Sequence, residues 1–505
     1  MAKREATKID METSGLLRKE RLLVWLLCGL AAARVFFFCA AFPFFNNTDE
    51  QAHFDLVLKY SHGNLPRGME SFSPESIRYL ALCSSPEFFV GPQHFPGRHF
   101  PSPVEGESSA ALSQAEQAWG HAVNAEAWQP PLYYAVGGVW LKLGQSFEFS
   151  EAHLLYWVRF LNVFLAAALV WLSFLAAREF FPEQAWLRLC VPLLTAFIPQ
   201  DMFYGIGNDT LSPVCFGAGF IFVVRWLRAE VPGGRLALGL GLAISATYLT
   251  KVSNAPLLAI ACFALALSLL STARSGKLRR ILPALGVLTV CVVVPVGVWT
   301  IWMQHAFGDA TGSAAHIQLS GWTRKPFAEW WQHPIFSWRG GSTFVSELIA
   351  SFWRGEFYWY GKRLASGLMD HFYILSSLVL IAIAAADLPR LNRKDKVTAG
   401  IVFLALLLLI ASVAFLVFIS IRFDFGDDFY PSSASPYLWS GRLISGALVP
   451  FVVLYIYGLG RAFSWTGKKW LPLAVVAIIA IAMTISEVQI SNQVFASAYN
   501  WFHIR

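Results

Sequence analysis

Residues 22–42 read LLVWLLCGLAAARVFFFCAAF and form the first of the long apolar segments that decide the fold of this chain. A helix needs about 20 predominantly apolar residues to cross the hydrocarbon core of a bilayer. Six basic residues lie between the start of the chain and this segment, and no small-residue cleavage site follows it. We therefore expect an uncleaved membrane anchor with its N-terminus in the cytoplasm.

The composition of the whole chain supports a membrane protein. Of its 505 residues, 56% are hydrophobic and 14% are charged, whereas soluble domains carry about 25% charged residues. The high apolar content and a net charge of +7 exclude a disordered chain, and the seven cysteines show no disulfide or metal-binding spacing. The basic residues cluster between apolar runs, which is typical of a topology signal. We expect a polytopic membrane protein that has no nucleic-acid partner.

The distribution of basic residues fixes the expected number of spans. The segment Gln129–Leu143 holds only about 14 apolar residues, which favours an interfacial or re-entrant helix. If this segment does not cross, the basic connections near Arg178, Arg228, Arg274 and Arg390 all face the cytoplasm; if it crosses, they face outward. We predict eleven spans, at 22–42, 157–177, 189–205, 211–227, 236–250, 255–271, 281–303, 371–387, 398–420, 441–460 and 470–487.

This topology predicts an all-α integral membrane bundle with outer juxtamembrane helices and an outer C-terminus. Its parts are a cytoplasmic segment 1–21, a transmembrane module 22–303 that includes an outer loop 46–156, an outer aromatic-rich loop 304–370, and C-terminal transmembrane helices 371–505. Six tryptophans of the second outer loop are candidates for an aromatic belt at the membrane interface: Trp322, Trp330, Trp331, Trp338, Trp353 and Trp359.

Ionisable residues within or beside spans are costly, so their positions indicate candidate sites. Arg34 interrupts the first span and should face the bundle interior, in a structural ion pair or against a substrate. Directly after this span, Asn46–Asp55 reads NNTDEQAHFD. Thr48 can cap a short helix whose first turn holds Asp49 and Glu50, with His53 on the same face as Asp49.

A carboxylate held there could act as a general base on a hydroxyl or an amine. The alternatives are a helix cap with solvated acids and half of a metal site formed by Glu50 and His53.

A second acid, Asp209, follows the third predicted span at a hairpin on the same membrane face as Asp49. A plain turn would also explain its sequence, Gly-Asn-Asp-Thr. Three cations lie at outer ends of spans, and they are Arg159, Lys251 and Arg442. Lys251 could simply extend its amine toward the membrane surface. Two acids and several cations on one face fit a transfer reaction from a lipid phosphate, because a base activates the acceptor and cations stabilise the leaving phosphate.

These motifs, in this order, resemble those of GT-C type glycosyltransferases, which take a sugar from a polyprenyl-phosphate carrier outside the cytoplasmic membrane. Asp49-Glu50 resembles the acidic pair of protein O-mannosyltransferases and the matching acid of lipid A aminoarabinose transferases. Residues 129–134, QPPLYY, resemble an outer-surface His-Pro-Pro-Leu-Tyr segment of the same superfamily.

An ordered set of motifs over about 400 residues is similar to a bacterial family of predicted polytopic membrane proteins of unknown function, related to GT-C enzymes. The set comprises residues 48–54, 129–134, 208–211, 249–251, 351–357 and 441–443. The chain departs from the family pattern at Gly207, where Asn is usual, and at Leu443, where Tyr is common. Neither departure removes a charged group.

The resemblance implies a GT-C type bundle that transfers a sugar in a single inverting displacement, with Asp49 as the catalytic base. Glu50 and Asp209 would support the acceptor, orient the base or bind a cation, and whether a divalent cation is used stays open. The residues expected to contact substrate are His53, Arg159, Lys251, Arg442, Gln129, Tyr133 and Asn208. Of these, Lys251 and Arg442 would hold the carrier phosphate, and a structural role for His53 is the alternative.

The expected partners are a polyprenyl-phosphate-linked sugar, an acceptor glycan, lipid or protein, and membrane lipids. The expected location is the inner membrane of a bacterium, with the active site on its outer face. Two other functions stay open at this stage. A transporter or flippase of lipid-linked sugars would place its charges near the bilayer midplane, and an O-antigen ligase or polymerase would carry its large outer loop late in the chain.

Overall fold

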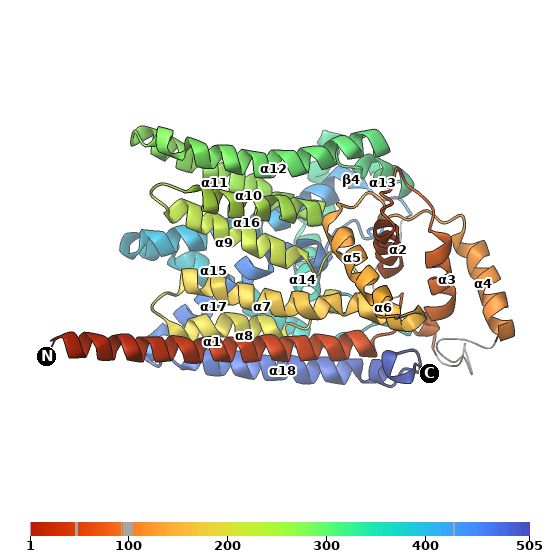
Figure 1. Ribbon diagram of the computed structural model, residues 1–505, viewed down its shortest axis with the longest axis horizontal. Helices are drawn as coiled ribbons and strands as arrows, with labels where there is room; N and C mark the ends of the chain where they lie inside the picture. Colours follow the sequence, from red (N-terminus) through yellow and green to blue (C-terminus); the bar gives the residue numbers. More distant parts are fainter. Residues whose placement is uncertain (1, 46–48, 92, 94–104, 428–429, 505) are drawn as a thin grey trace.

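The computed structural model describes residues 2–45, 49–91, 93, 105–427 and 430–504 of the chain. Figure 1 shows long helices running side by side in one bundle, with the N-terminus at one end and the C-terminus at the other. The bundle helices are α1 (Ala2–Ala41), α7 (Leu161–Phe180), α8 (Ala185–Phe197), α9 (Ser212–Arg228), α10 (Gly234–Thr250), α11 (Ala255–Arg274), α12 (Leu278–Phe307), α15 (Gly367–Lys394), α16 (Lys396–Arg422), α17 (Leu448–Ala462) and α18 (Leu471–Phe495). The predicted all-α membrane fold is confirmed.

Shorter helices gather at the end of the bundle where α1 finishes (Figure 1). They are α2 (Glu50–Ser61), α3 (Pro74–Cys83), α4 (Glu105–Trp119), α5 (Leu132–Ser146), α6 (Glu151–Arg159) and α13 (Ser313–Leu319), while α14 (Trp338–Arg354) packs against α15. Short 3-10 turns connect the elements: η1 (Pro86–Phe88), η3 (Asp201–Tyr204), η4 (Val252–Asn254), η5 (Phe327–Gln332), η6 (Pro334–Phe336), η7 (Gly441–Ala447), η8 (Ser464–Thr466) and η9 (Trp501–His503).

Strands are few and short among the described residues. Strand β1 (Thr323–Arg324) pairs antiparallel with β4 (Phe423–Asp424), and β2 (Tyr358–Trp359) pairs antiparallel with β3 (Lys362–Arg363). The first pair ties the loop that follows α12 to the end of α16.

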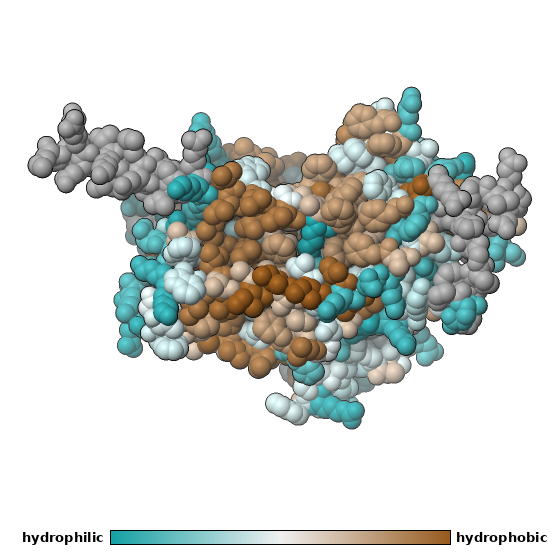
Figure 2. Space-filling model, turned by 90° about the horizontal axis from the view of Figure 1, so that it is seen from below, coloured by the Kyte–Doolittle hydropathy of each residue, from teal (hydrophilic) through white to brown (hydrophobic). Residues whose placement is uncertain are grey.

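Helix α17 forms the centre of the bundle, because every residue from Leu448 to Leu459 is buried. The outer helices instead expose large apolar side chains; α12, for example, leaves Val293 60% and Val298 64% exposed. Figure 2 shows an apolar band on another face of the bundle, the one where α18 and α1 lie in Figure 1, with hydrophilic residues toward its ends. An apolar surface of this kind is stable against lipid and not against water.

Among the described residues, eight helical segments are long and apolar enough to cross a membrane: 19–41, 151–180, 252–274, 278–307, 367–394, 396–422, 441–466 and 471–495. The predicted spans at 189–205, 211–227 and 236–250 correspond to α8, α9 and α10, which have only 13, 17 and 17 residues. These three helices pack inside the bundle against longer neighbours. The count of eleven spans therefore stays a prediction, with eight supported by length.

The ambiguous segment after Gln129 forms α5, which has 15 residues and is not among those eight segments. It packs against α2 at two glycines. A Cβ atom on Gly138 would lie 2.8 Å from the backbone nitrogen of Ser61, and one on Gly137 would lie 3.0 Å from a methyl group of Val57. The absence of side chains at both positions brings α5 onto α2, away from the bundle core.

The tryptophans of the loop 304–370 do not form a single belt. Trp353 and Trp359 are buried, whereas Trp331 is 64% and Trp338 is 92% exposed. The buried Trp353 ring stacks on Tyr373 of α15 with the ring centroids 5.0 Å apart. Only part of this set is available for the membrane interface, and the rest holds the loop onto the bundle.

Candidate active site

Asp49 lies directly before α2, which begins at Glu50. Its backbone is left-handed (φ 64°), a conformation that Asp tolerates better than most residues. The carbonyl oxygen of Asp49 accepts the backbone N–H groups of Ala52 and His53, while its carboxylate caps no backbone group. The predicted cap, Thr48, lies outside the described residues. The carboxylate of Asp49 is therefore free of the helix end and points to a partner elsewhere.

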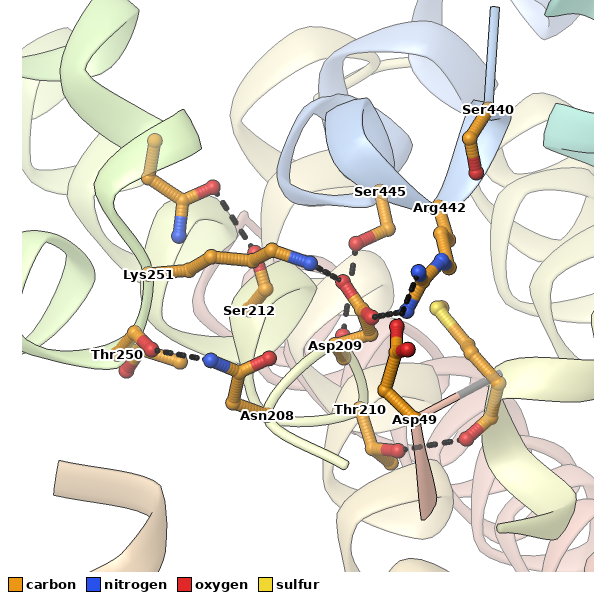
Figure 3. Close-up of polar contacts among 12 residues, drawn as sticks. Asp49, Asn208, Asp209, Thr210, Ser212, Thr250, Lys251, Ser440, Arg442 and Ser445 are labelled. Carbon is orange, nitrogen blue, oxygen red and sulfur yellow. Dashed lines mark hydrogen bonds and ion pairs between the residues drawn. The ribbon is translucent and has the colours of Figure 1, made fainter. Parts of the chain in front are cut away.

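That partner is Arg442 in η7, whose Nη2 donates to Oδ2 of Asp49 at 2.7 Å (Figure 3). The Nη1 atom of the same guanidinium lies 3.4 Å from Oδ2 of Asp209, in the loop between η3 and α9. Lys251, at the end of α10, donates its ammonium group to the other oxygen of Asp209. The structure thus brings together four of the predicted site residues from four separate parts of the chain.

These contacts keep both carboxylates ionised. Burial is the largest single effect and would raise the pKa of Asp49, but the charge and hydrogen bond of Arg442, together with the charges of His53 and Lys251, hold that pKa below its ordinary value. The same balance applies to Asp209, where the charges of Lys251 and Arg442 oppose burial and lower the pKa of the carboxyl group. Asp49 is 38% exposed and Asp209 only 5%, so Asp49 is the more accessible acid of the two.

His53 of α2 is buried. Its Nδ1 is 2.8 Å from the hydroxyl oxygen of Tyr134, and its ring lines a small pocket together with Asp209 and Arg442. Burial lowers the pKa of His53 despite the nearby acids, so the imidazole is neutral at pH 7. The departure at Gly207 lies directly beside this ring, since a Cβ atom there would be 3.4 Å from Cδ2 of His53.

Gln129, Tyr133 and Asn208 hold the Asp209 loop onto α5. Asn208 Nδ2 donates to Oε1 of Gln129 at 3.1 Å, and the Tyr133 hydroxyl accepts the backbone N–H of Gly207 at 3.1 Å. Gln129 in turn donates to Glu126 at 2.7 Å. The buried side-chain oxygen of Asn208 has no hydrogen-bond partner among the described residues. Two of these side chains are thus occupied by protein contacts, and Asn208 alone keeps a vacant acceptor.

Glu50 and Arg159 contact each other, and neither belongs to the network of Asp49, Arg442, Asp209 and Lys251. They form a buried pair, each 1% exposed, with Arg159 donating from Nε and Nη2 to the two oxygens of Glu50 at 2.7 Å. Glu50 also accepts the backbone N–H groups of Phe45 and Ile206, at 3.0 and 2.9 Å. Arg159 donates further to backbone carbonyl groups after α1, including that of Pro43 at 2.6 Å. Neither side chain lines the pocket, because each is saturated by contacts that fix the turn between α1 and α2.

Arg34 forms a structural ion pair, which is one of the two roles expected for it. It pairs with Glu487 of α18 through two hydrogen bonds of 2.8 and 2.9 Å and also donates to the hydroxyl group of Tyr204. The pair joins α1 to α18 inside the bundle, 8% and 4% exposed.

The pocket contains one acid that was not among the predicted site residues, Asp201. Asp201 lies eight residues before Asp209 and lines the same pocket as Asp209, His53 and Arg442. The loop sequence indicates that Asp201 lies near Asp209. The position of its carboxylate depends on a hydrogen bond from the backbone N–H of Glu356, which lies far away in the chain. No group of three or more His, Cys, Asp or Glu side chains in the part of the chain that the structure describes is placed to hold a metal ion.

The fold and this site define a polytopic helical membrane protein with a cluster of charged side chains at one end of its bundle. Residues 34–424 match the model of the predicted membrane protein family DUF2142, so the chain belongs to that family. The resemblance inferred from the motifs is thereby confirmed.

The chain is also similar to the crystal structure of ArnT from Cupriavidus metallidurans bound to undecaprenyl phosphate, with 14% identity and a TM-score of 0.46. That match covers 94% of this chain and 74% of ArnT. None of the curated proteins compared with the chain matches it.

Proposed function

We propose that this protein is a membrane glycosyltransferase that moves a sugar from a polyprenyl-phosphate carrier to an acceptor on the outer face of the bacterial cytoplasmic membrane. One observation carries the proposal: Arg442 bridges Asp49 and Asp209 while Lys251 holds the second oxygen of Asp209. An acid that can accept a proton and two cations that can hold a phosphate therefore meet at one end of an apolar bundle. The acceptor is a glycan, a lipid or a protein.

In the reaction we propose, Asp49 takes the proton from the acceptor hydroxyl or amine as the acceptor attacks the anomeric carbon of the sugar. The bond between that carbon and the phosphate oxygen breaks, and the carrier phosphate leaves with the electron pair. Lys251 and Arg442 stabilise the negative charge on the leaving phosphate. The attack occurs opposite the leaving group, so the configuration at the anomeric carbon inverts.

The ion pairs of the site give this mechanism an order. Arg442 donates to Asp49 at 2.7 Å, which keeps the carboxylate a weak base. A donor phosphate would compete with Asp49 for the same guanidinium group. Binding of the donor would then release Asp49 and raise its basicity at the moment when a base is needed. Glu50 and Arg159 support this arrangement from outside the pocket, by fixing the turn that carries Asp49.

Location on the outer face rests on the distribution of charge. The basic connections lie where the chain reverses, at the end of the bundle opposite to Asp49. Arg225 and Arg228, for example, form ion pairs with Glu179 at such a reversal. Under the positive-inside rule those connections face the cytoplasm. Asp49 and its partners would then face outward.

The test is a transfer assay with the full-length protein in vesicles. A panel of undecaprenyl-phosphate sugars is incubated with membranes of a strain lacking the protein as the source of acceptor, and release of undecaprenyl phosphate is measured. We expect Asp49→Asn to lower the rate about 10²- to 10⁴-fold, since loss of a general base has that effect. Asp424→Asn is the control, because this exposed residue lies in β4, outside the site. Full activity of Asp49→Asn would sink the assignment of the base, and translocation of the donor without sugar transfer would favour a transporter.

A further inference from the structure

A cavity of about 300 Å³ lies at the end of the bundle opposite to Asp49. Helix α17 begins directly after η7, which carries Arg442, and its last turn, with Arg461, lines this cavity. Figure 1 shows α15 and α17 far from α2. Four of the segments that are long and apolar enough to cross a membrane have one end at the cavity: 151–180, 367–394, 396–422 and 441–466. The cavity therefore lies where the hydrocarbon core of a bilayer gives way to its headgroups.

One face of α15 supplies a charged wall of the cavity. Four of its residues line the cavity at the spacing i, i+3, i+4 and i+7, which places them on one side of the helix: Asp387, Arg390, Leu391 and Lys394. The side chains of Arg390 and Lys394 are exposed, and neither forms an ion pair within the part of the chain that the structure describes. Two like charges four residues apart on a helix repel each other. An anion bound between them would remove that repulsion.

Two of the three acids in the lining are occupied by other groups. Asp387 accepts the hydroxyl group of Tyr457 at 2.6 Å and pairs with Nε of Arg461 at 2.9 Å. Asp395 caps α16, because its carboxylate accepts two backbone N–H groups of the first turn at 3.0 and 3.1 Å. The third acid, Glu183, is exposed. Two cations without an ion pair thus face one exposed acid, so a ligand that fills the cavity should be anionic.

The cavity also has an apolar part. Phe181 and Leu187 line it and are buried, 1% and 7% exposed. The ring of Phe181 stacks on that of Tyr457 with the ring centroids 6.5 Å apart. A volume of about 300 Å³ is at the lower end of the range for ligand pockets. It fits a charged headgroup with the first part of its apolar chain, and not a whole lipid.

We propose that this cavity binds the phosphate headgroup of an anionic phospholipid, and that Arg390 and Lys394 hold the phosphate oxygens. A guanidinium group can bind phosphate through two parallel hydrogen bonds, and an ammonium group acts as a point charge. Basic pockets between membrane helices suit anionic lipid headgroups. A soluble phosphate compound shares this chemistry, but the position at the ends of four apolar segments favours the lipid. The site lies apart from Asp49 and does not depend on the proposed function.

Native mass spectrometry of the full-length protein in detergent tests this site. The protein is titrated with phosphatidylglycerol, which is anionic, and with phosphatidylcholine of the same acyl chains, which is zwitterionic. We expect phosphatidylglycerol to bind more tightly. The double variant Arg390→Gln, Lys394→Gln should weaken its binding about 30-fold, because each basic residue near an anionic lipid surface strengthens binding about 5-fold.

The double variant Arg393→Gln, Lys469→Gln is the matched control. It removes the same charge from two exposed residues at the same end of the bundle, and neither residue lines the cavity. It should bind phosphatidylglycerol like the wild type. All four replaced side chains are exposed, so both double variants should fold, and equal thermal unfolding of the three proteins checks this.

Three results would overturn the inference. Equal weakening in both double variants would show a general attraction of lipid to the basic end of the bundle, and equal binding of the two lipids would show that charge is not recognised. Inorganic phosphate distinguishes the two sources of the phosphate group. We expect it to displace phosphatidylglycerol from the wild type only in large excess, because it lacks the apolar chains; displacement at a concentration equal to that of the lipid would assign the cavity to a soluble phosphate compound.

Discussion

Replacement of Glu50 by alanine tests the conclusion that Glu50 and Arg159 shape the site without entering it. The change removes two hydrogen bonds of 2.7 Å from Arg159 and two from backbone N–H groups. It also leaves the guanidinium of Arg159, 1% exposed, without its counter-charge. Breaking a buried ion pair from one side costs about 3–5 kcal/mol. We expect Glu50→Ala to lower the free energy of unfolding by about that amount.

The assay is unfolding of the detergent-solubilised protein by denaturant, followed through tryptophan fluorescence. Glu75→Ala is the matched control, because Glu75 pairs with His62 at 3.0 Å on the surface, with both residues 42% exposed. That pair should contribute no more than about 1 kcal/mol. A double variant, Glu50→Leu with Arg159→Met, should regain much of the lost stability, since apolar residues of similar volume often replace a buried pair without loss.

One combination of results would contradict a purely structural role for Glu50. If Glu50→Ala unfolds like the wild type and yet loses sugar transfer, Glu50 acts on the substrate, and its contacts with Arg159 do not define its role.

Three further predictions follow from other contacts. Arg34→Ala should destabilise the protein by about 3–5 kcal/mol because Glu487 is left buried and unpaired, and an added Glu487→Ala should restore part of that loss; equal stability of both single variants and the wild type would contradict the pair. Gly138→Val should lower the free energy of unfolding by at least about 1–3 kcal/mol, because a Cβ atom there would lie 2.8 Å from the backbone of α2. Gly286→Ala should lower it by less, because nothing lies within 4 Å of a Cβ atom at that position. The pKa of Asp209 is lowered in the folded protein, so its ionised carboxylate stabilises the fold above the ordinary carboxyl pKa, and this stabilisation is lost as pH falls through the lowered value. The difference in unfolding free energy between wild type and Asp209→Asn should therefore be constant from pH 7 to about pH 5 and shrink in stronger acid. A difference that stays constant down to pH 2 would show that it does not arise from the charge of Asp209.

The fold could be predicted to a large extent because apolar length and basic connections are local properties of the sequence. Each predicted span corresponds to one helix of the bundle. What length alone could not decide is whether α8, α9 and α10 cross the whole membrane, since they are shorter than a full span and are held by neighbouring helices. The short apolar run after Gln129 forms the 15-residue α5, which is not among the eight long apolar segments and packs against α2.

The charged site was predictable in part. Asp49, Asp209, Lys251 and Arg442 lie at the same end of predicted spans, and the structure joins them in one network. The sequence could not show that two adjacent acids would have different partners. Asp49 and Glu50 are adjacent, yet Asp49, whose backbone is left-handed, pairs with Arg442, and Glu50 pairs with Arg159.

Asp201 shows the limit of local reasoning most clearly. Its surroundings depend on the backbone N–H of Glu356 and on the missing side chain of Gly355, which lie about 150 residues further along the chain. No spacing rule relates such positions. Only the packing of η3 against the end of α14 brings them together.

In the mechanism that we propose, Lys251 and Arg442 hold the phosphate of a polyprenyl carrier beside Asp49. A cryo-electron microscopy structure of the full-length protein with undecaprenyl phosphate tests it most directly. We predict density for the phosphate within hydrogen-bond distance of Lys251 and Arg442, with the bond between Arg442 and Asp49 broken. A phosphate bound elsewhere, with the 2.7 Å contact between Arg442 and Asp49 intact, would contradict the account.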